Sequence, residues 1–382
     1  MAAKVMGIAN GMQRFEAARL SVELGIFDLL AREPLTASRV AHEIGASERG
    51  TEVLLEYLRT MSLLENSCAS FWRRKDTPCV YSPSAASRWF FVKDSGPAYL
   101  GGLLATVYGS REKTMKLFDS KAALVRGGGQ PLEVAKDESF YREFADASWD
   151  FSKGPAESLA AFLKDILNEK SPQEVLDVAC GSGVYGAHVA LLYPDARVTA
   201  LDTEDVLANT RRLIPSSLQS RFSFLPGSAL SAPLPPNTFD VILVSNFVHV
   251  FDFETNIKLI DRLATSLKPQ GIILINDFLR HDYNTPFSPL FHDPRPLEFD
   301  FTMLYSTPRG RTYSLPDLDR LFQANNLERT NLKTNFPFPM TFIAAKKIKD
   351  DIQQQHCGST GDDTTCPTTT TSAGDGDDNK HN

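Results

Sequence analysis

A glycine-rich turn near the middle of the chain has the residue types and the spacing of a cofactor site. Gly181, Gly183 and Gly186 form a GxGxxG pattern between an apolar run that predicts a strand and a run that predicts a helix. Glycines let the backbone approach a ligand closely, and a helix N-terminus favours an anionic group. Asp202 ends the next predicted strand, about 20 residues further on, where a carboxylate can reach ribose hydroxyls. The pattern therefore indicates a dinucleotide or S-adenosylmethionine.

Asp177 favours the second of these ligands. A carboxylate at the end of the strand before the glycines would repel a pyrophosphate, but it can hold the cationic methionine end of S-adenosylmethionine. The segment 267–277 and the closing apolar strand point the same way. We therefore expect S-adenosylmethionine as the cofactor, and a nicotinamide-dependent oxidoreductase is the disfavoured alternative.

The elements that must position these residues follow residue 170. Short apolar runs alternate there with helical patterns, which is typical of a parallel α/β sheet. The last run follows a turn-rich stretch and suits an antiparallel strand at the edge of the sheet. The candidate strands are residues 174–178, 197–202, 222–226, 239–246, 271–278 and 339–347.

The N-terminal part predicts short amphipathic helices followed by a hairpin. Thr36 and Ser47 are the expected N-caps of two helices, and Gly45 is the expected C-cap of the first. Residues 71–84 contain two extended pieces around turn-forming residues, which indicates the hairpin. Helices with such a hairpin make a winged helix. The following stretch, from about residue 96 to residue 170, is expected to be helical.

DNA binding is the functional alternative for a winged helix, but the charges of the helix that would contact DNA disfavour it. The helix that would enter the groove carries Glu48, Glu52 and Glu56 against Arg49 and Arg59. A recognition helix that faces phosphates should not be net acidic. The charges therefore favour dimerisation or plain structural packing for this domain, and of the two we expect a homodimer, with no nucleic-acid partner.

Composition limits the remaining classes of protein. The formal net charge is −7, and residues 357–382, with five Asp and one Lys, contribute −4 of it. That last segment has no Leu, Ile, Val or aromatic residue, so we expect it to be disordered. No apolar run approaches a membrane span, and no secretory signal is found. The five cysteines are scattered and show no disulfide framework, which predicts a cytoplasmic protein without a membrane partner.

The chain from about residue 10 to residue 348 resembles the plant-type and hydroxyindole-type small-molecule O-methyltransferases, and it is closer to their bacterial relatives. The stretches that carry the resemblance are LGIFDLL, LLEYLRTMSLL, VLDVACGSGVYG, ALD, FDVILVSNFVHVFD, LKPQGIILIND and GRTYSLPDLDRLFQANNL. The resemblance implies an α/β fold with a class I methyltransferase, Rossmann-like sheet that is parallel except for one antiparallel edge strand. An N-terminal all-α winged-helix dimerisation domain would precede that sheet.

The same resemblance implies how the chain is divided. Residues 1–100 would form the dimerisation domain, and residues 101–170 a helical connector that contributes to the substrate pocket. Residues 171–348 would bind the cofactor and catalyse the reaction, and residues 349–382 would form the tail.

The resemblance also assigns a pair of catalytic residues. A histidine at the position of His249 is the general base in the family, and Asp277 occupies the position of the acidic residue that orients it. Histidine is the side chain most often used for this task. The chain departs from the plant-type pattern in the residues after His249, which are Val250, Phe251 and Asp252. It also has Gly310 where those enzymes carry a second orienting glutamate, and His249 could instead anchor the substrate.

Further positions follow from the resemblance. Ser228 stands beside the adenine position, where many relatives have an acidic residue, and Ser245 and Asn246 stand near the methionine portion of the cofactor. His281 and His292 lie on a proline-rich segment with two aspartates, but their spacing matches no standard ligand set, so we expect no metal. The residues expected to line the acceptor pocket are Phe144, Trp149, Phe278 and Met303.

The function that these observations favour is methyl transfer from S-adenosylmethionine to a hydroxyl group of a small aromatic or polyketide-like molecule. Methyl transfer to a carbon atom of a small molecule is the first alternative, because some bacterial relatives perform it. A winged-helix regulator whose α/β domain senses a ligand is the second. The sequence does not identify the acceptor.

Overall fold

The fold is described from a computed structural model of the chain. It describes residues 10–67, 78–93, 99–107, 124–129, 138–168, 170–280, 295–335 and 340–348. The expected disordered tail therefore lies outside the described residues. Among them, no helix is long and apolar enough to cross a membrane.

The N-terminal part combines short helices with a small antiparallel sheet. The strands pair in the order β1-β3-β2, and the helices enclose an apolar core that includes Phe27, Leu55 and Leu58. The helices are α2 (Gly11–Glu23), α3 (Ile26–Arg32), α4 (Ala37–Glu43), α5 (Glu48–Thr60) and α6 (Ala85–Phe90), and the strands are β1 (Leu35–Thr36), β2 (Leu64–Asn66) and β3 (Val80–Pro83).

Local sequence signals explain where these helices begin and end. The side chain of Thr36 accepts a hydrogen bond from the backbone N–H of Arg39, and that of Ser47 accepts one from Gly50, so both expected N-caps are confirmed. Gly45 follows the last residue of α4 and its cap, Ile44. Its φ of 65° lies in the left-handed region that favours glycine and turns the chain away from the helix.

The hairpin after α5 differs from the prediction in its first strand. The helix ends at Thr60, and Ser62, with a φ of 59°, turns the chain into β2 at Leu64, before the residues 71–84 in which the hairpin was expected. β2 then pairs with β3, and residues 68–77 between them lie outside the described residues.

The expectation of cysteines without disulfides is wrong at Cys79. This residue is disulfide-bonded, and Cys180, the other described cysteine, is free. Spacing along the chain did not reveal the pair, because it does not report which thiols the fold brings together.

The stretch expected to be helical contains α7 (Gly101–Val107) and the long helix α10 (Glu138–Leu167). A seven-stranded sheet follows, with the strand order β11-β12-β8-β7-β4-β5-β6. Its elements are β4 (Glu174–Val178), α11 (Val184–Leu192), β5 (Arg197–Asp202), α12 (Glu204–Leu213), β6 (Phe222–Pro226), β7 (Phe239–Ser245), α13 (Phe253–Ser266), β8 (Leu267–Asp277), α16 (Leu315–Gln323), β11 (Leu327–Asn335) and β12 (Met340–Lys347).

Six strands were predicted, and all six are confirmed as β4, β5, β6, β7, β8 and β12. The antiparallel strand is β12, which pairs with β8, as the closing strand should. It lies one place inside the edge, because β11 pairs antiparallel along its outer side. β11 was not predicted as a strand, since after Leu327 its described side chains are exposed and mostly polar.

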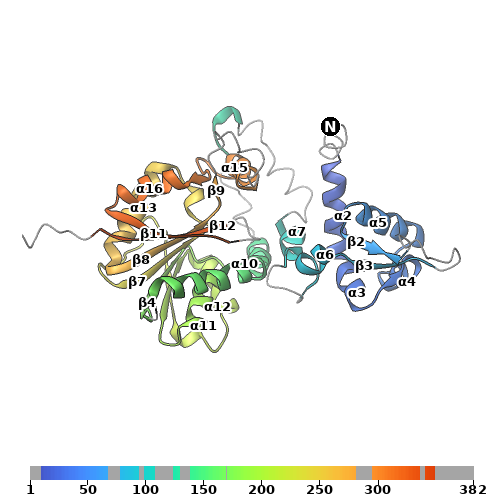
Figure 1. Ribbon diagram of the computed structural model, residues 1–382, viewed down its shortest axis with the longest axis horizontal. Coiled ribbons are helices and arrows are strands. Elements are labelled where there is room, and N and C mark those ends of the chain that lie inside the picture. Colours follow the sequence, from blue (N-terminus) through green and yellow to red (C-terminus); the bar gives the residue numbers. More distant parts are fainter. Residues whose placement is uncertain are drawn as a thin grey trace, which may run out of the picture. The chain divides into compact units, whose positions relative to one another are not determined.

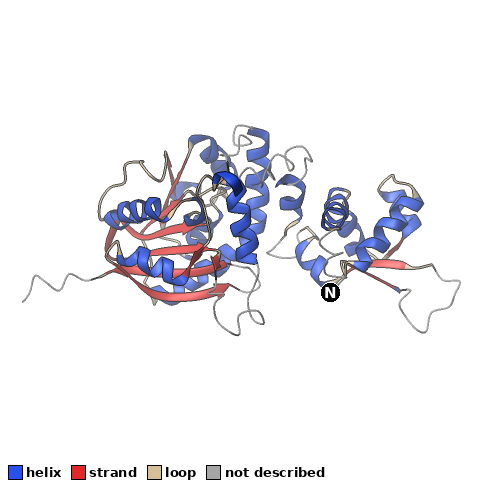
Figure 2. Ribbon diagram, turned by 90° about the horizontal axis from the view of Figure 1, so that it is seen from above, coloured by secondary structure: helices blue, strands red, loops and turns tan. Residues whose placement is uncertain are grey.

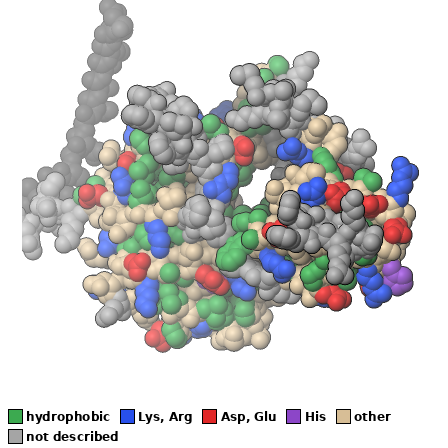
Figure 3. All heavy atoms as spheres, turned by 45° about the vertical axis from the view of Figure 1, so that its right-hand side comes forward, with side chains coloured by type: hydrophobic (Ala, Val, Ile, Leu, Met, Phe, Trp, Pro, Cys, Tyr) green, Lys and Arg blue, Asp and Glu red, His purple; other side chains and the backbone are tan. Residues whose placement is uncertain are grey.

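Helices cover both faces of this sheet (Figures 1 and 2). Alternate residues of β8 show why, because Ile272 and Leu274 pack in the core with α10 and α11, whereas Ile273 and Ile275 pack in the core with α13 and α16. Strands buried on both faces are typical of parallel α/β folds. On the face of the molecule in Figure 3, basic and acidic side chains of the described residues are interspersed rather than gathered by sign.

Candidate functional site

The glycine-rich turn after β4 has the backbone geometry that its sequence predicts. Ala179, Gly181 and Gly183 all have φ between 51° and 79°, in the left-handed region. A Cβ on Gly183 would lie 2.7 Å from Cγ2 of Thr210, so close packing also demands a glycine there. A Cβ on Gly181 would meet no atom within 4 Å, so this side of the turn is open to a ligand.

Asp202 at the end of β5 is tied directly to this turn. Its Oδ2 accepts a hydrogen bond of 3.0 Å from the backbone N–H of Gly181, and its Oδ1 accepts one of 2.8 Å from Thr203. Burial raises the pKa of the Asp202 carboxyl, while these two N–H groups oppose the rise. The structure thus brings Gly181 and Asp202 together, and the carboxylate oxygens keep lone pairs for a further donor such as a ribose hydroxyl.

Asp177 lies in β4, the strand that leads into the glycine turn and pairs with β5, and it is almost wholly buried. Its Oδ2 accepts a hydrogen bond of 3.0 Å from the backbone N–H of Gly186, at the start of α11. A Cβ on Gly186 would approach that oxygen to 2.8 Å, so the third glycine is required by the carboxylate itself. Burial raises the pKa of Asp177 to about 7, and the nearby charge of Asp202 adds to the rise. A cation bound close by would favour the ionised form.

Ser245 and Asn246 lie where β7 ends, beside the end of β8. The side-chain amide of Asn246 donates to the hydroxyl of Tyr185, and its backbone N–H donates to the carbonyl of Asn276. Within the described part of the chain, Ser245 Oγ, Asn246 Oδ1 and both amide atoms of Asn276 are buried without a hydrogen-bond partner. Each such atom costs about 1–3 kcal/mol, so this cluster is suited to receive water or a ligand.

Tyr185 and Asn276 were missed by the sequence analysis. Asn276 could have been noticed, because an amide inside the apolar run of β8 is unusual and it is fully buried there. Tyr185 gave no such signal, since an aromatic residue on a buried helix is ordinary.

His249 and Asp277 form a direct link between the segment after β7 and the end of β8. His249 lies in the 3-10 turn η4 (Val248–Val250), and its Nδ1 is 2.7 Å from Oδ1 of Asp277. Both side chains are buried, and the backbone N–H of Phe278 also donates to Oδ1. A carboxylate only accepts hydrogen bonds, so Nδ1 must carry the hydrogen, and Nε2 is left with the lone pair that can accept a proton.

Aromatic rings surround this imidazole. Phe299 on α15 (Arg295–Ser306) meets the His249 ring edge-on, with centroids 4.7 Å apart, and it stacks on Phe278 at 4.1 Å. Phe299 was not predicted, because the sequence gives no sign that α15 packs against the turn after β7. An aromatic wall beside a proton acceptor suits a flat, apolar acceptor molecule.

The other predicted residues are less closely connected to this pair. Ser228 is exposed after β6, and its Oγ accepts from the backbone of Leu230. Trp149 packs against the core between α10 and the sheet, and Met303 is buried on α15. The side chain of Phe144 lies outside the described residues, as do His281 and His292. No group of three potential metal ligands occurs within the described ranges.

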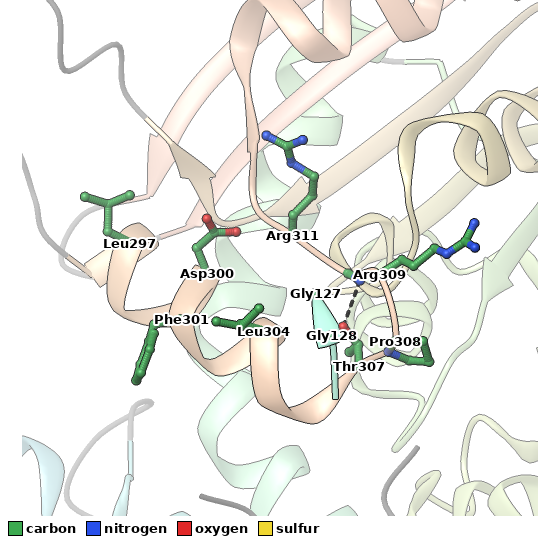
Figure 4. A pocket seen from close by; sticks show the side chains of 11 residues that line it. Gly127, Gly128, Leu297, Asp300, Phe301, Leu304, Thr307, Pro308, Arg309 and Arg311 are labelled. Atoms are coloured by element: carbon green, nitrogen blue, oxygen red, sulfur yellow. Dashed lines mark hydrogen bonds between the residues drawn. The ribbon is translucent and has the colours of Figure 1, made fainter. Parts of the chain in front are cut away.

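A cavity of about 450 Å³ lies on the other side of α15, next to residues 307–311 (Figure 4). Leu297, Phe301 and Leu304 form its apolar wall. The guanidinium groups of Arg309 and Arg311 point in different directions, so they do not form a joint anion site. None of the predicted site residues lines this cavity.

Comparisons with known proteins agree with this architecture. The model of the O-methyltransferase dimerisation domain matches residues 6–93, and that of a methyltransferase domain matches residues 175–271. Acetylserotonin O-methyltransferase of Mus musculus is 28% identical over 288 residues, which are 71% of each chain. The mitomycin biosynthesis 6-O-methyltransferase of Streptomyces lavendulae is 25% identical and covers 72% of this chain and 77% of its own.

The fold is that of solved class I methyltransferases. The structure of human N-acetylserotonin methyltransferase in complex with S-adenosylmethionine superposes with a TM-score of 0.73 at 20% identity. The match covers 91% of this chain and 98% of the human chain. The expected class I methyltransferase fold, a mostly parallel sheet preceded by an N-terminal helical domain, is thereby confirmed, whereas the antiparallel strand β12 is not the edge strand that was expected.

The raised pKa of Asp177 makes a prediction for stability. Between pH values of about 4 and 7 the folded chain holds a proton that the unfolded chain, with a pKa near 3.8, has lost. The free energy of unfolding should therefore fall as pH rises through this window, by up to about 1.4 kcal/mol per pH unit from this group. Asp177→Asn should flatten that dependence in denaturant titrations at pH 5, 6 and 7. Parallel curves for the two proteins would contradict the assignment.

Proposed function

The chain belongs to the O-methyltransferases that join a dimerisation domain to a methyltransferase domain, and we propose that it methylates a hydroxyl group of a small aromatic or polyketide-like molecule. S-adenosylmethionine supplies the reactive methyl group, already activated by the positive charge on sulfur. The observation that carries the proposal is the His249–Asp277 pair, because a buried imidazole with a fixed hydrogen on Nδ1 presents Nε2 as a base. Acetylserotonin and mitomycin enzymes among the relatives support an aromatic hydroxyl as the target.

The residues at the glycine turn fit the cofactor. The open side of Gly181 leaves room for it, the Asp202 carboxylate can accept from ribose hydroxyls, and buried Asp177 can balance the cationic methionine end. Ser245 Oγ and the Asn246 amide oxygen offer unused hydrogen-bonding capacity for the same portion of the cofactor. Exposed Ser228 is the proposed neighbour of the adenine.

The remaining chemistry is done by the side chains around the acceptor. His249 would remove the hydroxyl proton at Nε2 as the acceptor oxygen bonds to the methyl carbon and the bond from that carbon to sulfur breaks, with a neutral thioether as the leaving group. Asp277 would stabilise the resulting imidazolium. The stacked rings of Phe278 and Phe299 hold an aromatic acceptor against the imidazole, with Trp149, Phe144 and Met303 proposed as further walls. Holding the acceptor oxygen in line with the methyl group supplies much of the rate.

Methyl transfer to a carbon atom of the acceptor is the second candidate reaction, and one observation favours it. Gly310 stands where plant-type relatives carry a second orienting glutamate, and among the described residues Asp277 is the one carboxylate bonded to the His249 imidazole. An activated carbon needs less help from a base. Product analysis by mass spectrometry and NMR separates an O-methyl from a C-methyl group directly.

We propose that the protein is a homodimer built through residues 1–100, arranged as a winged helix that packs against its copy. Residues 101–170 would connect it to the catalytic domain, residues 171–348, and residues 349–382 would form the tail. Large apolar side chains exposed in the first part support an interface: Met12, Leu24, Val53 and Trp89. Localisation in the cytoplasm is part of the same proposal and rests on the five cysteines being scattered along the chain rather than arranged as a disulfide framework, with one disulfide bond at Cys79.

Replacing Asp202 tests the cofactor site. Asp202→Ala removes the acceptor for ribose hydroxyls, so binding of S-adenosylhomocysteine should weaken by about 1.5–3 kcal/mol in calorimetry. Asp195→Ala, at an exposed turn after α11, is the matched control and should bind like the parent. Parent-like affinity in Asp202→Ala would show that the ribose lies elsewhere.

His249 is tested by kinetics with a panel of phenols that includes N-acetylserotonin and a 3-hydroxynaphthoate. His249→Gln should lower kcat by roughly 10²–10⁴-fold, the range for general base catalysis, and Asp277→Asn by less. High pH should restore part of the activity, because a phenol with a pKa of about 10 ionises without a base. The control is His42→Gln, at an exposed position on α4. Loss without rescue at high pH would make His249 a substrate anchor.

The dimer is tested by light scattering at micromolar concentration. The full chain should give twice the mass of the 42.3 kDa chain, whereas a protein that starts at residue 101 should give a single mass. The physical reason is that the truncation removes the exposed apolar side chains that a partner would cover. A truncated protein that stays dimeric places the interface in the catalytic part instead.

A further inference from the structure

The turn that carries His249 is held from behind by a second segment of the chain. We propose that residues 307–313, together with Asn256, fix the position of the His249 backbone, and that Gly310 is the positioning residue on which this contact depends. The inference rests on the proposed role of His249 as the base. It concerns residues that touch neither cofactor nor acceptor.

Three carbonyl oxygens, two in the turn and one directly after it, accept hydrogen bonds from other segments. Val248 accepts from the side-chain amide of Asn256 at 2.8 Å, and His249 accepts from the backbone N–H of Arg311 at 2.8 Å. Phe251 accepts from the hydroxyl of Tyr313 at 2.7 Å. Asn256 also donates to that hydroxyl, at 3.2 Å, so the donors form one connected group. The backbone on both sides of the imidazole is therefore fixed.

Gly310 allows this close approach. A Cβ at position 310 would lie 2.5 Å from the carbonyl oxygen of His249, 3.0 Å from that of Val250, and in contact with Oγ1 of Thr307. Carbon atoms do not approach a carbonyl oxygen to 2.5 Å, and neither backbone can give way alone, because Arg311 N–H binds the same oxygen. Any larger side chain must therefore move the two segments apart.

The segment is itself anchored to the helix that touches the imidazole. Oγ1 of Thr307 accepts from the backbone N–H of Gly310 at 2.8 Å, the bond drawn in Figure 4, and donates to the carbonyl of Met303. Met303 and Phe299 belong to α15, and Phe299 lies edge-on to the His249 ring. One continuous unit thus contacts both the backbone and the ring of His249.

The charged residues nearby contribute less. Arg309 pairs with Asp252 at 3.2 Å, but the arginine side chain is 78% exposed, and exposed ion pairs are worth little. Asp252 already serves as the N-cap of α13 through the backbone N–H of Thr255. The hydrogen bonds to the turn carbonyls, which are buried or partly buried, therefore carry the positioning.

The test is a double-mutant cycle between Gly310 and His249. With the phenol of the panel that the parent enzyme methylates fastest, Gly310→Ala should lower kcat by roughly 10- to 100-fold, since a misplacement of about 1 Å costs up to that much. KM for the phenol and the affinity for S-adenosylhomocysteine should stay within a factor of about three, because, within the described part of the chain, residues 307–313 form hydrogen bonds to the His249 turn and to α15 and not to the glycine turn. In the His249→Gln background, Gly310→Ala should have little further effect, because contacting residues that act through one group are not additive.

Two further variants keep the test sharp. Tyr313→Phe removes the hydroxyl that donates to the Phe251 carbonyl without adding volume, so it should also lower kcat, but by less than Gly310→Ala. It serves as the test variant if Gly310→Ala folds poorly. Gly11→Ala, at a glycine whose Cβ would meet nothing, is the control for a glycine replacement as such.

The outcomes separate this inference from the proposed function. Equal losses from Gly310→Ala in both backgrounds, or parent-like turnover in Gly310→Ala, would overturn the positioning role. Parent-like turnover in His249→Gln would instead overturn the base role, and the positioning role with it. We expect Gly310→Ala to lower kcat in the protein that retains His249 but not in His249→Gln, and we expect high pH to restore part of the lost turnover.

Discussion

The 2.7 Å contact between Nδ1 of His249 and Oδ1 of Asp277 is the interaction on which the rest of the site depends. It joins residues from the ends of two neighbouring parallel strands, so it exists only if β7 and β8 keep their register. In that register Val241 pairs with Ile272 and Ser245 with Asn276. The apolar residues of both strands, such as Val241 and Ile272, are buried in the cores under the two helical layers. The apolar strands are thus needed to hold two polar side chains at hydrogen-bonding distance, away from water that would weaken their interaction.

Much of the catalytic domain could be predicted, because its strands are strongly apolar runs between clear turns. The strand β11 could not, since an exposed outer strand needs no apolar pattern and is recognised only by its pairing with β12. The glycine turn and Asp202 were predictable, because the turn requires left-handed backbone and a carboxylate at a fixed distance along the chain. His249 and Asp277 came from a family resemblance, and the structure adds their distance and the nitrogen that faces the carboxylate.

The residues that sequence reasoning missed share one property, which is that they act through contacts between distant segments. Phe299 touches His249 across 50 residues of chain, and Gly310 meets its carbonyl from still further along. From the sequence, Gly310 was only a departure from a family pattern. In the structure it is the residue that lets a loop approach the histidine turn. The cysteine at position 79 shows the same limit, because its pairing depends on the fold rather than on spacing.

The central claim of this account is that Nε2 of His249 accepts the proton of the acceptor hydroxyl. A crystal structure with S-adenosylhomocysteine and a phenol that the enzyme methylates tests it most directly. The account predicts the phenolic oxygen at about 2.6–3.2 Å from Nε2, with Nδ1 still on Asp277 and the sulfur of the cofactor product facing that oxygen. A phenolic oxygen far from Nε2, bound instead by the amides of Asn246 and Asn276, would contradict it.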